Sequence, residues 1–128
     1  MEGYKAKVAG SWKELSVKEK IAFKETDGFI KLDEVVTPED DLVITLKNYI
    51  IVAVENPKAE QTNYNQYILV TEEGEIYVTS SDTFDSSISD KLDEIADAGD
   101  EMGDWKLRIY KRESKNFKGK YFLTCAII

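Results

Sequence analysis

The residues best suited to chemistry are cations and aromatic rings that share one segment around position 110. Side chains spaced by two project from one face of a strand, and positions 106 to 112 hold three cations and a tyrosine at that spacing. The turn that follows adds lysines around a phenylalanine. The full set is Lys106, Arg108, Tyr110, Arg112, Lys115, Phe117, Lys118 and Lys120. Cations neutralise phosphates and flat rings stack on bases, so this pattern is typical of a surface that binds single-stranded nucleic acid.

Tyrosines in neighbouring predicted strands can extend such a surface. Tyr64, Tyr67 and Tyr77 each carry a ring that a base can stack on. A plainer interpretation stays open, because outward cations also keep strand edges from pairing. Tyrosine is moreover common in strands for packing reasons alone.

Most enzyme classes lack the side chains they need in this chain. The sequence has no histidine and one cysteine, Cys125, which excludes Ser-His and Cys-His nucleophile pairs, His-ligated zinc and a Cys-rich metal site. Cys125 lies in an apolar run, where a cysteine is typically a small core residue. We also find no phosphate-binding glycine loop and no calcium loop. We therefore expect no enzymatic activity and no cofactor or metal ion, although carboxylate catalysis stays formally open.

The net charge of −8 is distributed unevenly along the 128 residues. Residues 1–81 carry −6, residues 82–104 carry −8, and residues 105–128 carry +6, with seven Lys or Arg against Glu113. A local basic patch can bind a polyanion on an acidic protein, because salt confines electrostatic fields to about 8–10 Å. The acidic segment has two interpretations, a solvated helix face or a surface that imitates a phosphate backbone.

One helix is predicted between residues 82 and 98. Ser81 or Asp82 can cap its first turn, and Gly99 is suited to end it. Apolar residues recur at spacings of four, four and three, which forms one buried stripe. The stripe consists of Phe84, Ile88, Leu92 and Ile95.

The remaining elements are mostly strands. Residues 42–54 are β-branched and aromatic, which indicates a bent strand or two strands broken near Lys47 and Asn48. Residues 67–70 and 76–79 form a hairpin whose turn needs Gly74. Residues 105–112 and 120–128 form a second hairpin, with Trp105 expected in the core on alternation grounds.

Strands, one helix and a terminal hairpin follow the element order of an OB-fold. We expect a mainly β protein with an OB-like five-stranded barrel and a helix between its third and fourth strands. A generic α+β sandwich fits the same pattern. Residues 1–17 are interpreted as an arm or short elements, and residues 18–128 as a single OB-like domain.

Three stretches resemble the single-stranded DNA-binding proteins of small tailed phages that infect Gram-positive bacteria. The first runs from residues 18–21 through 30–34, the second covers 67–70 and 74–81, and the third covers 114–120 and 122–125. The resemblance implies an OB-like barrel that coats displaced single strands during phage DNA replication with little sequence preference. The turn with Lys115, Phe117 and Lys118 matches the family's pattern best.

The predicted partner is single-stranded DNA. The alternative is an acidic DNA mimic or inhibitor that binds a host protein, and a domain without nucleic-acid contact is a third interpretation. Homo-oligomers and contacts with replication proteins are left open. No apolar run reaches the roughly 20 residues that span a bilayer, so no membrane partner is expected. The first residues lack a signal-peptide pattern, so we expect a cytoplasmic protein. The resemblance to phage proteins implies that this is the cytoplasm of the bacterial host.

Overall fold

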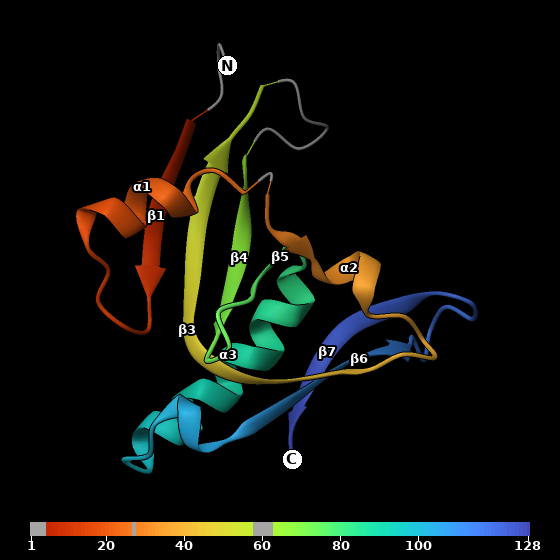
Figure 1. The fold of residues 1–128 in the computed structure, drawn as a ribbon. Helices are drawn as coiled ribbons and strands as arrows, with labels where there is room; N and C mark the ends of the chain where they lie inside the picture. The colour runs from red at the N-terminus through yellow and green to blue at the C-terminus, as the bar shows by residue number, and fades with distance from the viewer. Residues whose placement is uncertain (1–4, 27, 58–62) are drawn as a thin grey trace.

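The computed structural model describes residues 5–26, 28–57 and 63–128 (Figure 1). In chain order the elements are β1 (Lys5–Ser11), α1 (Val17–Phe23), β2 (Ile30–Lys31), α2 (Leu32–Val35), β3 (Leu42–Glu55), β4 (Asn63–Thr71), β5 (Ile76–Thr79), α3 (Asp82–Asp97), the 3-10 helix η1 (Met102–Asp104), β6 (Lys106–Glu113) and β7 (Tyr121–Ile127). The protein is therefore mostly β, as the sequence predicts.

The described strands form one curled, open sheet. Its order is β2-β5-β4-β3-β6-β7. Strand β1 pairs with residues 50–55 of β3, whereas β6 pairs with residues 42–45. All pairs are antiparallel except β2 with β5. Figure 1 shows β3 curving from the upright part of the sheet into the part formed with β6 and β7, with α3 inside the curl. The described residues contain seven strands where five were predicted, and α3 follows the fifth strand in chain order.

The curl depends on a break in the middle of β3. The register with β4 shifts between Leu46 and Asn48, which is the predicted position of the bend. The buried Asn48 side chain accepts hydrogen bonds from the Lys13 amide (2.9 Å) and the Tyr49 amide (2.8 Å). These bonds satisfy amides at a place where the ladder is interrupted. One half of β3 then pairs with β4 and β1, and the other with β6.

The part of the sheet beyond the bend separates two cores, one on each of its faces. Ile44 and Leu46, which precede the bend in β3, face α3. Tyr49, which follows the bend, also faces α3. Beyond the bend, Ile50 and Val52 face the opposite side of the sheet. There they pack with Leu15 and Phe23, so the segment that includes α1 covers the outer face of the sheet. The central strands are thus buried on both faces.

Helix α3 matches its prediction in each feature. Ser81 caps it by accepting a hydrogen bond from the Phe84 amide, and the predicted stripe is buried. Gly99 ends it with φ +81°, and Gly74 turns the β4–β5 hairpin with φ +93°. In addition, the Ser87 hydroxyl accepts a hydrogen bond from the Cys125 amide of β7 (3.4 Å). This contact links α3 to β7, which is the last strand in the sheet order.

The N-terminal segment is part of the sheet. Residues 5–11 of the predicted arm form β1, which pairs with β3 from Lys5 opposite Glu55 to Ser11 opposite Ile50. Helix α1 begins with a capping box in which Ser16 and Glu19 exchange hydrogen bonds. Residues 1–4 lie outside the described residues.

Candidate nucleic-acid interface

The outer face of β6 carries the predicted cations. Lys106, Arg108 and Arg112 are exposed and Tyr110 is half-buried, whereas Leu107 and Ile109 are buried. The predicted alternation is therefore confirmed. It arises because β6 packs only one face against α3 and the interior.

Strand β7 adds an aromatic ring to the same face. Residues opposite each other in an antiparallel pair project to the same side, and Phe122 lies opposite Arg112. Phe122 is half-buried. Alternation along residues 120–128 indicates this outward position, but Phe122 is not among the residues predicted from the sequence to bind nucleic acid.

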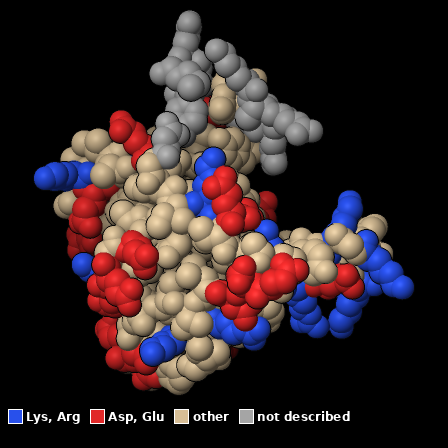
Figure 2. All heavy atoms as spheres, turned by 45° about the vertical axis from the view of Figure 1, so that its right-hand side comes forward, with Lys and Arg blue, Asp and Glu red and all other residues tan. Residues whose placement is uncertain are grey.

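The β6–β7 turn presents a phenylalanine between lysines. The Ser114 amide donates to the Lys120 carbonyl (2.8 Å), and Gly119 adopts φ +81° to close the turn. Phe117 remains 62% exposed, and the Lys120 ammonium lies 5.7 Å from the centre of its ring. Figure 2 shows Lys and Arg gathered on the projecting end of the molecule, while Asp and Glu spread over its body. We call residues 115–120 the basic tip.

Two cations near this face have protein partners. The Arg108 Nε donates to Asp41 Oδ2 at 2.6 Å, and its guanidinium lies 4.5 Å from the Tyr110 ring centre. Lys111 points to the other side and donates to the Asp33 carbonyl (3.1 Å). Arg108 is thus held over Tyr110 by a residue 67 positions away in the sequence.

Tyr67 and Tyr77 do not lie on this face. They are 2% and 4% exposed, so neither ring is accessible to a base. The structure therefore corrects the prediction that Tyr67 and Tyr77 belong to the nucleic-acid interface. Tyr67 stacks on Tyr49 with ring centres 6.3 Å apart, and its hydroxyl donates to Asp82 (2.6 Å). The reason is that both faces of β4 and β5 are covered: Tyr67 and Tyr77 pack in the core with α3, and Ile68 and Val78 pack in the core on the other face.

Burial of Tyr67, together with its bond to the Asp82 carboxylate, raises the pKa of the phenol from 10.0 to about 12. The folded protein then holds this proton more tightly than the unfolded chain does. The corresponding stability is present below pH 10 and is lost as the pH rises toward 12. We expect denaturant unfolding to show this loss, and Tyr67→Phe to reduce it. An equal alkaline loss in both proteins would contradict the assignment.

Trp105 also departs from its prediction, since it is 39% exposed instead of buried. It precedes β6 and follows η1, and its indole nitrogen donates to Asp100 (3.3 Å). Strand alternation does not extend to a residue outside the strand, which explains the difference.

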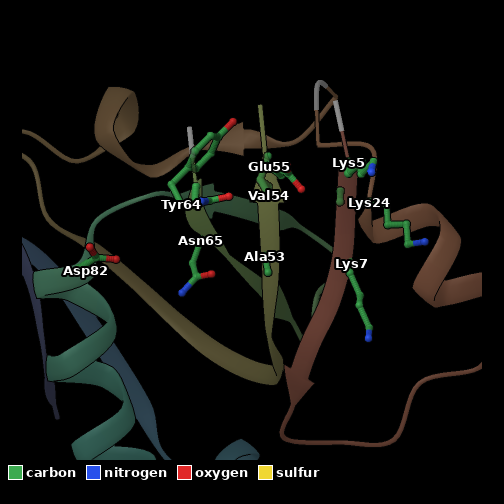
Figure 3. Close-up of a pocket in the computed structure, with 11 residues that line it drawn as sticks. Lys5, Lys7, Lys24, Ala53, Val54, Glu55, Tyr64, Asn65 and Asp82 are labelled. Carbon is green, nitrogen blue, oxygen red and sulfur yellow. The ribbon is translucent and has the colours of Figure 1, made fainter. Parts of the chain in front are cut away.

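Tyr64 belongs to a separate, open pocket of about 1100 Å³ at the far end of β1, β3 and β4. Figure 3 shows Lys5 and Lys7 on β1 to one side and Asp82 at the start of α3 on the other. Tyr64 lies opposite Val54, whereas β6 pairs with β3 at residues 42–45. The pocket is therefore at the opposite end of β3 from the basic face.

Several carboxylates of the acidic segment have structural partners. Asp85 accepts from the Tyr49 hydroxyl (2.8 Å), and Glu101 pairs with Lys13. The exposed acids of α3 that remain are Asp90, Asp93, Glu94 and Asp97. Within the described residues, no group of three or more Cys, Asp or Glu is arranged to hold a metal ion.

Comparison of the chain with protein-family models, with curated proteins and with solved structures finds no significant match. Across the described ranges, no helix combines the length and apolar character needed to cross a membrane.

Proposed function

We propose that this protein is a non-enzymatic, sequence-tolerant single-stranded DNA-binding protein. The observation that carries the proposal is the outer face of the β6–β7 hairpin, where Lys106, Arg112 and the basic tip surround Tyr110 and Phe117. Cations along a strand can follow phosphates, and exposed rings can stack on any base. Neither kind of contact reads a base edge, which is why little sequence preference is expected.

The strand pairing supports an OB-like interpretation of the fold. If β3 to β7 are taken as the five barrel strands, α3 lies between the third and the fourth. Strand β5 pairs with β2 instead of β7, so the described pairings leave this barrel open. OB-folds bind oligonucleotides on the face of their second and third strands and on two loops. Here the segment with α1 covers that face, so the β6–β7 loop remains as a contact surface.

The biological role follows from the resemblance to phage proteins. A protein that contacts phosphates and bases without reading sequence can coat the strands displaced during phage DNA replication. Replication proteins would then meet the protein on DNA in the host cytoplasm.

The proposal is tested by fluorescence anisotropy with labelled DNA of about 30 nucleotides, long enough for an OB-type site. We expect tight binding to the single strand, weaker binding to the duplex, and lower affinity at higher salt. Phe117→Ala and Tyr110→Ala should each weaken binding by about 1–3 kcal/mol. Tyr121→Ala is the matched control, because Tyr121 is an exposed ring on the other face of the hairpin. Absence of binding at low salt would reject the proposal.

The ion pair of Arg108 makes a prediction of opposite sign. Asp41→Asn removes the carboxylate that Arg108 contacts at 2.6 Å, which frees the guanidinium for a phosphate. We expect affinity for single-stranded DNA to rise by up to about fivefold at 0.1 M salt, with a salt slope steeper by about 0.7. Glu39→Gln in the same loop is the charge-matched control. Equal changes in both variants would show a general charge effect and no role for Arg108.

A DNA mimic is the second candidate, favoured by the exposed carboxylates of α3. Such a protein would not bind DNA, and it would lose a host partner when Asp93, Asp97 and Glu101 are neutralised. Glu101 already pairs with Lys13, which leaves fewer free carboxylates for this role.

A further inference from the structure

A small, open pocket beside Trp105 is lined by apolar residues, which we call its floor, and by acidic residues, which we call its rim. Its volume is about 250 Å³, and its floor is formed by Ile95, Ala98, Trp105 and Ile127. A cavity of about 150 Å³ accepts a benzene ring, so one phenyl group fits here. Three carboxylates line the rim, namely Asp90, Glu94 and Asp100. The one lysine of the pocket, Lys91, donates its hydrogen bonds to Ser87.

The basic tip has the complementary chemistry. Phe117 is the most exposed aromatic side chain among the described residues. Lys115, Lys118 and Lys120 give the tip three positive charges and no negative one. An apolar ring flanked by cations matches an apolar pocket flanked by carboxylates in both size and charge.

A tip cannot reach the pocket of its own molecule. Trp105 precedes β6 and the tip follows it, so the eight residues of the strand separate them. A strand of that length spans roughly 25 Å at about 3.3 Å per residue. The partner must therefore be another molecule.

Charge also distinguishes this pocket from the exposed apolar surface of α1. Val17 and Ile21 of α1 are 74% and 58% exposed, but the helix and its C-cap carry Lys18, Lys20 and Lys24 against one acid, Glu19. These cations would repel the basic tip. The acidic rim of the Trp105 pocket, in contrast, attracts it.

We propose that the basic tip of one copy docks into the Trp105 pocket of a second copy, with Phe117 inserted between the floor and the rim. The two surfaces differ, so the contact is head-to-tail and can continue from copy to copy. This inference goes beyond the proposed function, because both surfaces belong to the DNA-free protein. The tip lysines also belong to the proposed DNA interface, so docking and strand binding compete for them.

Sedimentation velocity without DNA tests the contact through complementation. The tip variant carries Phe117→Ala and Lys118→Gln, and the pocket variant carries Asp90→Asn and Glu94→Gln. We expect the wild-type protein to form species that grow with concentration and shrink at high salt. Each variant alone should associate at least about tenfold more weakly, since a central aromatic anchor dominates a small interface. An equimolar mixture should form dimers that do not grow, because one intact tip meets one intact pocket.

Glu39→Gln with Glu73→Gln is the control, since it removes the same charge away from the pocket and should associate like the wild type. Circular dichroism checks that each variant folds, as expected for exposed positions. A monomeric wild type at all concentrations, or a mixture that forms no dimer, would overturn the inference. A monomeric wild type that binds single-stranded DNA would reject docking alone, whereas an associating protein that does not bind DNA would reject only the proposed function.

Discussion

Replacement of Phe84 by alanine is expected to lower the free energy of unfolding by about 3–5 kcal/mol. Phe84 is fully buried on α3 and shares the inner core with Tyr49 and Ile109. Removing the ring takes apolar surface out of the core and leaves a cavity that the curled sheet can close only in part. Total stabilities of domains are about 5–15 kcal/mol, so the loss is a large fraction of the whole. Chemical denaturation followed by circular dichroism measures it.

The control is Thr83→Ala, at the exposed neighbouring position of the same helix. This change should alter stability by no more than about 0.5 kcal/mol. A loss below about 1 kcal/mol for Phe84→Ala would mean that α3 does not pack inside the curl. Such a result would remove the helix from the core that supports β6 and β7.

Neutralising three cations of the basic face is expected to weaken single-stranded DNA binding by about 100-fold at 0.1 M salt. The variant carries Lys106→Gln, Arg112→Gln and Lys115→Gln, all at exposed positions. Each phosphate contact on a single strand contributes about 0.7 to the salt slope, which is about fivefold in affinity at 0.1 M salt. Three lost contacts therefore reduce the slope by about 2. Anisotropy titrations at several salt concentrations measure both quantities.

The matched control neutralises Lys5, Lys7 and Lys18, which lie on β1 and α1 away from the hairpin. It changes the net charge by the same amount. Its affinity should stay close to that of the wild type. If both triple variants lost affinity equally, DNA binding would depend on overall charge and the β6–β7 face would not be the interface.

Features that depend on neighbours in the sequence could be predicted well. The cap and stripe of α3, Gly74 in its hairpin and the alternation of β6 are all confirmed. Each depends on interactions within a few residues, which the order of residue types reveals. The break in β3 near Asn48 belongs to the same class, because Lys47 and Asn48 interrupt a run of β-branched and aromatic residues.

The burial of Tyr67 and Tyr77 does not depend on neighbours in the sequence and could not be predicted in this way. Residues 67 to 69 are all buried, because α3 covers one face of β4 and the segment with α1 covers the other. Alternation tells which side chains share a face, but it does not tell whether another element covers that face. The same limit applies to Trp105, whose exposure depends on where η1 ends and β6 begins.

By itself, the sequence determined helix α3, the strands from residue 42 onward, the side chains that share a face of β6, and the concentration of positive charge after residue 105. Only the tertiary structure decided that Asp41 pairs with Arg108, that β1 joins β3, and that the sheet stays open in the described residues. It also placed the acidic Trp105 pocket and the basic tip at opposite ends of one strand. The physical reason is range: backbone preference and periodicity act over a few residues, whereas pairing and burial join segments far apart in the chain.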